Sequence, residues 1–413
     1  MVFTTFLVTL DPELPVYVPG QAVNGYLTVA CHEEVSCRSI KITIKGQSKV
    51  HWSEKSGKSR RHYRAGELYF RHPILVWGGE GSGNSFSPGY RKFPFSFILP
   101  RDIPSSFVSN IGKVMYQVKA EADLPWSFDK SHKVFFSVNF MYDLNLDPFA
   151  TIPMVIQKED TVCCCCCAEG PIEMNMRAQR SGYVSGESIL VNGDVMNNTS
   201  STIEYTEIKL IQVTTYITKA KQKQIERTVQ RVYHPQLGSR CRDVWENVPL
   251  PIPAVPASHL KHCNIITIQY IFVLLAKFGT CKTVKAKVPV IVGSLPLQNT
   301  YSSFLVQPSA AEIGGTTMTV PINHSPRHSP RHSPAVPSHS HPPSAPSPTA
   351  PPYSGDPPPY TENFLPEEFR EVPPPSYASC VFGNTNDGRL GDDAEDSDTG
   401  EFSPRYLTYR TQT

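Results

Sequence analysis

Residues 17–23 read YVPGQAV, and the same pattern returns at residues 183–189 as YVSGESI. In each copy a turn that contains glycine leads into a stretch of alternating apolar residues, which is typical of a turn followed by a β-strand. Self-similarity at a distance of this size predicts two copies of one supersecondary architecture. The alternative is that two unrelated β-turns resemble each other by coincidence.

Period-two alternation continues outward from both copies. Ile40, Ile42 and Ile44 alternate with polar residues, and the stretch from Val114 to Ala120 does the same, which predicts half-buried strands. Residues 219–231 fit a short helix or an edge strand equally well, and the pattern alone leaves both open. Further strands are expected at 2–10, 23–31, 132–143, 203–218, 263–275 and 283–292. These strands predict an all-β chain of two tandem β-sandwiches.

Composition narrows the classes of function. A formal charge of +2 over 413 residues gives no argument for nucleic-acid binding. The longest apolar run, 265–276, is shorter than the roughly 20 residues of a membrane-spanning helix, and the amino-terminal residues read as a strand rather than a secretory signal. Eleven cysteines, an odd number, favour a reducing cytoplasm over a disulfide framework.

The composition changes sharply near residue 295. Of the 39 prolines, 21 lie between Pro296 and Pro404, among Ser, His and Gly. Such a stretch cannot bury enough apolar surface to offset the entropy of ordering its backbone, about 1–2 kcal/mol per residue. We therefore expect four parts: a β-sandwich at 1–146, a linker with a cysteine run at 147–168, a second β-sandwich at 169–294, and a disordered Pro/Ser/His-rich tail at 295–413.

Two copies of the pattern PPxY lie in that tail. In a polyproline II helix the first two prolines form a preformed ridge, and the tyrosine fills a second pocket of a WW domain. A plain proline-rich spacer is the alternative, and the repetition of the pattern favours binding. The expected WW-domain ligands are Pro357, Pro358 and Tyr360 in the first copy and Pro374, Pro375 and Tyr377 in the second.

Other features of the tail have weaker specificity. Pro343, Ser344, Ala345 and Pro346 form a PSAP sequence, a candidate ligand of the endosomal sorting complex, although a Pro/Ser/Ala-rich tract also produces it by chance. The repeat HSPRHSPRHSP offers Ser325, Ser329 and Ser333 as phosphorylation sites. Its histidines have no folded surroundings to fix them, so no metal site is expected.

The folded part of the sequence holds few candidates for chemistry. The run Cys163, Cys164, Cys165, Cys166, Cys167 could be acylated at a membrane, or it could form a strand whose thiols behave as small apolar groups. The basic stretch 49–64 could meet phosphates or form a solvated hairpin. No phosphate-binding loop, metal-ligand set or nucleophile motif is present, so we expect no enzyme, no catalytic residues, no cofactor and no metal.

Seven longer segments carry a resemblance to a known family. The segments are VYVPGQAVNGYLTV (16–29), VHWSE (50–54), FPFSFILPRDIPSSF (93–107), GKVMYQVKAEAD (112–123), GPIEMNMRAQRSGYVSGESI (170–189), HCNIITIQY (262–270) and VPVIVG (288–293). They resemble the α-arrestins, the arrestin domain-containing proteins. The resemblance implies two arrestin-type, immunoglobulin-like β-sandwiches, no catalysis, and adaptor work in the trafficking and ubiquitination of membrane proteins.

The resemblance also implies partners. These are HECT-type ubiquitin ligases with WW domains, and membrane receptors or transporters as cargo, met from the cytoplasm by peripheral association at the plasma membrane and endosomes. Two alternatives stay open. One is a redox scaffold, because HCNIITIQY resembles the segment around a thioredoxin-binding cysteine in one member of the family, which places Cys263 there. The other is a vesicle-budding scaffold that acts through Pro343–Pro346.

Overall fold

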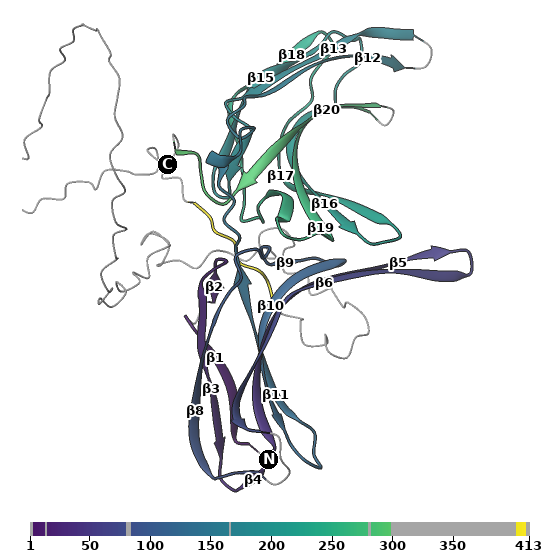
Figure 1. The fold of residues 1–413 in the computed structure, drawn as a ribbon. Helices are drawn as coiled ribbons and strands as arrows, with labels where there is room; N and C mark the ends of the chain where they lie inside the picture. The colour runs from purple at the N-terminus through teal and green to yellow at the C-terminus, as the bar shows by residue number, and fades with distance from the viewer. Residues whose placement is uncertain are drawn as a thin grey trace, which may run out of the picture. The chain divides into compact units, whose positions relative to one another are not determined.

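The computed structural model describes residues 3–12, 15–79, 84–164, 167–279, 282–298 and 402–409 (Figure 1). These residues form two β-sandwiches in chain order, which confirms the predicted all-β fold class. Short 3-10 turns at η1 (Leu144–Leu146) and η2 (Ser258–Leu260) are the helical elements of this described part.

The first sandwich has one three-stranded and one six-stranded sheet. The smaller sheet has the order β1-β3-β8, and the larger has the order β2-β11-β10-β5-β6, with β9 paired to β10. A separate short pair, β4 with β7, lies beside them. The strands are β1 (Thr5–Asp11), β2 (Val16–Tyr17), β3 (Ala22–Cys31), β4 (Val35–Ser36), β5 (Ser39–Ser56), β6 (Ser59–Gly78), β7 (Ser85–Phe86), β8 (Gly89–Ile98), β9 (Phe107–Val108), β10 (Gly112–Asp123) and β11 (Lys130–Val138).

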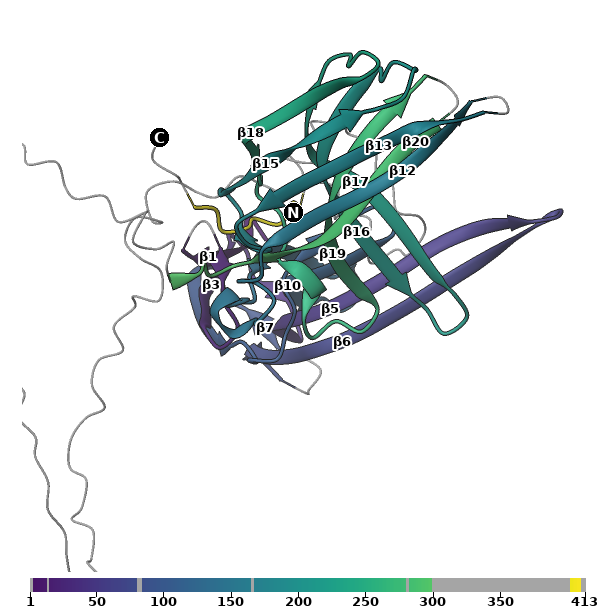
Figure 2. The same ribbon diagram turned by 90° about the horizontal axis from the view of Figure 1, so that it is seen from above.

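The second sandwich packs a four-stranded sheet, β12-β13-β15-β18, on a five-stranded sheet, β14-β20-β19-β16-β17. Figure 2 shows these two layers from above. The strands are β12 (Met154–Cys164), β13 (Cys167–Ala178), β14 (Gly182–Val184), β15 (Ser188–Asn197), β16 (Tyr205–Ile217), β17 (Gln222–His234), β18 (Cys241–Pro251), β19 (Ile266–Phe278) and β20 (Lys282–Gly293).

The alternating residues form the core of each sandwich. In β5, Ile40, Ile42 and Ile44 are fully buried, and Ile44 lies opposite Val118 of β10. Side chains alternate across a strand, so one face of this sheet collects the apolar residues, and Lys41 and Thr43 between them face outward. The burial of each isoleucine contributes roughly 1.5–3 kcal/mol.

Both sandwiches contain the turn that was recognised in the sequence. Tyr17 lies in β2, which pairs in parallel with β11, and Tyr183 lies in β14, which pairs in parallel with β20. Gly20 and Gly186 have φ values of 90° and 97°, which only glycine adopts without strain. The two turns are therefore equivalent in pairing and in backbone conformation.

The residue after each glycine ties the turn to its own strand. Gln21 Oε1 accepts a hydrogen bond from the Val18 amide at 2.8 Å, and Glu187 Oε2 accepts one from the Val184 amide at 2.9 Å. The only chemical difference is that Glu187 is charged. Arg180 compensates for this charge through Nη2, which lies 3.0 Å from Glu187 Oε1.

A buried tyrosine contact is also repeated. Tyr116 donates its hydroxyl hydrogen bond to the Pro104 carbonyl at 2.6 Å, and Tyr270 donates to the Pro256 carbonyl at 2.7 Å. Both rings are fully buried in their sandwiches. Buried phenols need such a partner, so each one fixes a proline-containing loop against its sheet.

A serine follows each of these proline loops and makes a third repeated contact. Ser106 Oγ accepts from the Val138 amide, and Ser258 Oγ accepts from the Val292 amide, both at 2.9 Å. Val138 and Val292 are the partners of Tyr17 and Tyr183 in the parallel pairs. The repeat predicted from the sequence thus extends to the hydrogen bonds around each turn.

The structure resolves the ambiguous segment and shifts two boundaries. Residues 219–231, open between helix and strand, lie largely in the edge strand β17, because register with β16 outweighs local helix propensity. β12 pairs with β13 along its length, so the second sheet includes residues 154–164, which were assigned to the linker. Residues 295–298 and 402–409, assigned to the tail, pack on the sandwiches.

The cysteine run departs from the expected single strand. Cys163 and Cys164 end β12, Cys167 begins β13, and Cys164 lies opposite Cys167. Identical thiols carry no turn signal such as glycine or proline, so only the pairing of the flanking strands places the reversal here. Cys165 and Cys166, and the side chains of the whole run, lie outside the described residues.

We expect the replacement Glu187→Ala to lower the free energy of unfolding by about 3–5 kcal/mol, because it leaves Arg180 unpaired and the buried Val184 amide without its acceptor. Glu187→Gln keeps an acceptor of the kind that Gln21 supplies, and should cost about 1–2 kcal/mol. Urea unfolding measures both values. Equal losses in the two variants would show that the acceptor at this turn is unimportant.

Candidate functional site

The sequence-predicted binding motifs lie outside the described residues, so the structure does not place them. These motifs are Pro357, Pro358, Tyr360, Pro374, Pro375 and Tyr377, the PSAP sequence at 343–346, and Ser325, Ser329 and Ser333. The structure does describe the residues that flank this region on both sides, and they form the candidate site.

The residues before the motif-bearing region bind the connection between the two sandwiches. The Leu144 amide donates to the Leu295 carbonyl at 3.2 Å, and the Gln298 amide donates to Asn145 Oδ1 at 2.9 Å. Leu297 is 8% exposed. The chain is therefore held at 295–298 before it enters the region of the motifs.

The residues after that region, 402–409, bind the first sandwich. Asn139 donates its side-chain amide to the Arg405 carbonyl at 3.0 Å, and the Arg405 amide donates to Ser137 Oγ at 3.1 Å. The Tyr406 hydroxyl donates to the Ser106 carbonyl at 2.9 Å. Ser106, which also accepts the Val138 amide hydrogen bond, lies just before β9, and Ser137 lies at the end of β11.

The same segment also binds the second sandwich. The Tyr409 amide donates to the Ser185 carbonyl at 2.9 Å, and its hydroxyl donates to the Ser294 carbonyl at 2.8 Å. A Cβ on Gly186 would lie 1.8 Å from the Tyr409 carbonyl oxygen, so glycine permits this approach. Residues 402–409 are thus a bridge between the two sandwiches, and we call them the carboxyl-terminal strap.

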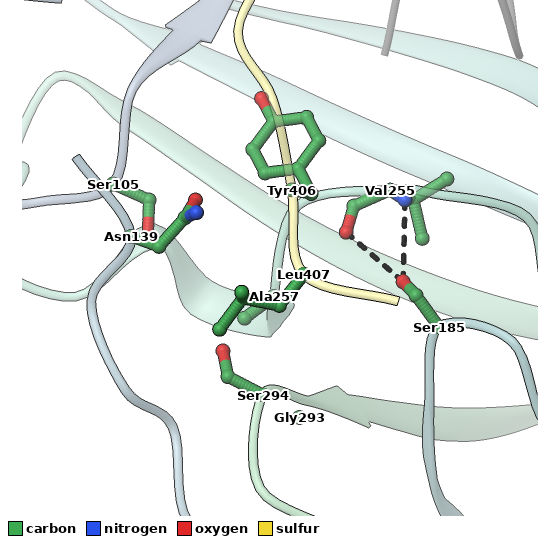
Figure 3. Close-up of a pocket in the computed structure, with 9 residues that line it drawn as sticks. All are labelled: Ser105, Asn139, Ser185, Val255, Ala257, Gly293, Ser294, Tyr406 and Leu407. Atoms are coloured by element: carbon green, nitrogen blue, oxygen red, sulfur yellow. Dashed lines mark hydrogen bonds between the residues drawn. The ribbon is translucent and has the colours of Figure 1, made fainter. Parts of the chain in front are cut away.

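The strap closes over a small cavity (Figure 3). Its volume is about 10 Å³, room for one water at most, so it does not fit a small-molecule substrate. Asn139 Oδ1 is buried there without a hydrogen-bond partner in the described part of the chain. The lining residues are Ser105, Asn139, Ser185, Val255, Ala257, Gly293, Ser294, Tyr406 and Leu407.

A second set of contacts joins the sandwiches through the β5–β6 hairpin. Glu67 of β6 accepts from the side-chain amide of Asn264 at 2.8 Å and from its backbone amide at 3.1 Å. Tyr216 of β16 donates its hydroxyl to Ser109 Oγ at 2.7 Å. These polar contacts come from loops and strand ends of both sandwiches, a composition typical of interfaces between domains of one chain.

The end of this hairpin is strongly basic. β5 pairs with β10 only as far as Val50, and beyond that point it pairs with β6 alone. Stacking of Trp52 on Tyr63, at 5.2 Å between ring centres, supports this extension. Glu54 is paired with Lys221 at 2.6 Å. The exposed side chains Lys55, Lys58, Arg60, Arg61 and Arg64 leave the tip with an excess of positive charge.

Cys263, the residue expected to carry any redox function, lies beside this interface. Burial raises the pKa of its thiol, and a hydrogen bond with Tyr69 offsets only part of that effect. A thiol that captures another protein needs exposure and a lowered pKa. Cys263 is only partly exposed and its pKa is raised, so its environment disfavours facile disulfide exchange.

Family comparisons match both sandwiches. The model described as "Arrestin (or S-antigen), N-terminal domain" matches residues 6–145, and the model described as "Arrestin (or S-antigen), C-terminal domain" matches residues 168–297. Together they cover more than half of the chain.

The chain belongs to the α-arrestin family. It is 28% identical to arrestin domain-containing protein 17 of Caenorhabditis elegans over 303 residues, 69% of each chain. It is 28% identical to arrestin domain-containing protein 4 of Mus musculus over 312 residues, 72% of each chain. It is 25% identical to thioredoxin-interacting protein of Sus scrofa over 384 residues, which cover 91% of this chain and 95% of the relative.

Arrestin-domain proteins are non-catalytic adaptors, and an adaptor or scaffold role is the function that this α-arrestin shares with its family. Within the described residues, no group of three or more His, Cys, Asp or Glu side chains could hold a metal ion. The same residues contain no helix that is long and apolar enough to cross a membrane.

The strap is the feature of this α-arrestin that sequence reasoning missed. Its residues were assigned to the tail because prolines and charged residues dominate the surrounding composition. The local signal was the density of apolar and aromatic side chains in FSPRYLTYR, where Phe402, Tyr406, Leu407 and Tyr409 occur within eight positions. Of these, Tyr406 and Tyr409 are only 3% and 9% exposed.

We expect Cys263 to react with iodoacetamide at pH 7.5 at least ten times more slowly than Cys241, because Cys241 is exposed and the raised pKa of Cys263 leaves little thiolate. Its rate should keep rising above pH 9, the range of an ordinary thiol. Peptide mass spectrometry resolves the two sites. Equal rates at pH 7.5 would contradict the burial of Cys263.

Proposed function

We propose that this α-arrestin is an adaptor that brings membrane-protein cargo to a HECT-type ubiquitin ligase with WW domains. It would thereby promote ubiquitination, endocytosis and endosomal sorting of the cargo. The observation that carries the proposal is the pair of PPxY motifs, at 357–360 and 374–377, in a chain whose folded part is two arrestin sandwiches.

The proline pairs of the PPxY motifs favour the extended backbone that a WW domain binds. A proline pair restricts its own backbone toward polyproline II before any partner arrives, so less conformational entropy is lost on binding. Seventeen positions separate Tyr360 from Tyr377, and a flexible chain spans them with an r.m.s. distance of roughly 20–25 Å. Two WW domains of one ligase can then bind together, and tethering raises avidity about 10²- to 10⁴-fold.

The sandwiches and the basic hairpin form the cargo-binding side in this proposal. Arg60, Arg61 and Arg64 present guanidinium groups, which pair with carboxylates and phosphates in two-point contacts. Acidic or phosphorylated cytoplasmic tails of receptors and transporters fit that chemistry. The adaptor would act from the cytoplasm and reach the plasma membrane and endosomes through its cargo.

Both ends of the motif-bearing region support the proposal. Ser294 lies just before that region, and its carbonyl accepts the hydrogen bond of Tyr409, which lies after it. A ligase bound at Tyr360 or Tyr377 is thereby tied to the cargo-binding sandwiches at two points of the chain. Such a tie keeps the ligase and its substrate in one assembly, which raises their effective concentration.

A redox scaffold is a second candidate, and the observation that favours it is the similarity to thioredoxin-interacting protein over most of both chains. The raised pKa of Cys263 weighs against it. A DTT-sensitive complex with thioredoxin, lost in Cys263→Ser, would favour this scaffold over the adaptor.

The double replacement of Tyr360 and Tyr377 by Ala should abolish capture of the full-length chain by a tandem WW-domain protein, because each phenol fills the second pocket of its WW domain. Each single replacement should only weaken capture, since one motif remains. A pull-down from purified components measures this.

Tyr353→Ala is the matched control, because Ala350-Pro351-Pro352-Tyr353 lacks the first proline of the motif and should leave capture unchanged. Undiminished capture of the double variant would refute the ligase-recruiting role.

A further inference from the structure

Besides the hydrogen bonds of Arg405, the strap is attached to the first sandwich through the phenol of Tyr406. Its side chain is almost fully buried, and its hydroxyl donates to the Ser106 carbonyl. In Figure 3 the strap passes between Ser105 and Asn139 of the first sandwich and Ser185 and Val255 of the second. Tyr406 therefore lies at the junction where both sandwiches meet the strap.

The Ser106 carbonyl receives a hydrogen bond from the Tyr406 hydroxyl. Ser106 is fully buried, and its own amide and hydroxyl are used in hydrogen bonds with Val138. The phenol gives the carbonyl a donor from the strap. A buried carbonyl that loses its donor pays the cost of desolvation without a partner, so the first sandwich favours the strap in its bound position.

A phosphoryl group on Tyr406 would reverse this preference. The ester oxygen can no longer donate to the Ser106 carbonyl, and the group adds a charge of about −1.5 to −2 where a carbonyl oxygen already lies 2.9 Å away. The sandwich residues that line the cavity are all uncharged. Burying a group of this charge against a carbonyl oxygen is strongly unfavourable, so the modified residue belongs in water.

We propose that Tyr406 is a phosphorylation site that controls the strap: the unmodified phenol binds the strap across the two sandwiches, and phosphotyrosine at this position detaches it. A tyrosine kinase supplies the group by transferring the γ-phosphoryl of ATP to the phenol oxygen. The phenol proton leaves, and ADP is released. Because the docked side chain is buried, the kinase acts on the strap when it is transiently open.

Detachment has a defined structural consequence. Tyr409 follows Tyr406 by three residues, and its contacts to Ser185 and Ser294 are the strap's hold on the second sandwich. When Tyr406 leaves, its neighbour Arg405 is drawn away from Asn139 and Ser137 as well, so the strap loses its hydrogen bonds to the first sandwich. The two sandwiches are then joined by their connecting residues, by the contact of Glu67 in the β5–β6 hairpin and by that of Ser109 between β9 and β10.

The test uses the full-length chain with phosphotyrosine installed at position 406 by genetic code expansion. Hydrogen–deuterium exchange of residues 402–409 reports the strap, because the Arg405 and Tyr409 amides donate to the sandwiches when it is bound. We expect exchange of these two amides to become at least ten times faster than in the unmodified chain. Exchange in β3 and β19 should stay unchanged.

Two further chains control this experiment. Phosphotyrosine at Tyr233, whose residue is 67% exposed on the edge strand β17, adds the same group and should leave the strap protected. Tyr406→Phe keeps the ring and loses the hydroxyl, and should accelerate exchange of the strap only about three- to tenfold, as expected for one hydrogen bond.

Three outcomes would overturn the proposal. The first is unchanged exchange of the strap with phosphotyrosine at 406, and the second is equal acceleration with phosphotyrosine at 233. The third is accelerated exchange throughout β3 as well, which would make Tyr406 a structural residue of the first sandwich rather than the control point of a separable strap.

Discussion

The glycine turn that recurs in both sandwiches is the constraint on which the rest of the structure depends. Gly20 and Gly186 adopt a backbone conformation that places a short strand in parallel on the last strand of its own sandwich. The last strands then end beside the inter-sandwich connection. In the second sandwich the same turn accepts the strap, because Gly186 has no side chain to block Tyr409. One backbone requirement therefore serves both the fold and the candidate site.

The two sandwiches keep the same hydrogen bonds and differ in their electrostatics. Gln21 caps the first turn as a neutral amide, whereas Glu187 caps the second as a carboxylate and requires Arg180. The Glu187 turn needs more partners than the Gln21 turn, because a buried charge must be both paired and hydrogen-bonded. Glu187 lies two residues after Ser185, whose carbonyl accepts the Tyr409 amide, so this charged turn is also the one that contacts the strap.

The sandwich surfaces and the proposed PPxY ligands depend on different constraints. The sandwiches offer surfaces fixed by strand register, such as the basic hairpin beyond Val50. The proposed motifs would need no such support, since a proline pair restricts its own backbone. The strap combines a short local segment with a folded surface. It lies far along the sequence, and its tyrosines donate hydrogen bonds to backbone carbonyls of the folded sandwiches.

The sequence by itself determined the alternating strands and the repeated turn, because side-chain periodicity and glycine act through the local backbone. Tertiary structure alone decided the strand assignment of Gln222–His234, the reversal within the cysteine run, and the burial of Tyr406. Each of these depends on a partner that is distant in sequence: β16 for the edge strand, the pairing of β12 with β13 for the reversal, and the Ser106 carbonyl for the phenol. Local propensity carries no information about such partners, because the contact exists only once both sandwiches have folded.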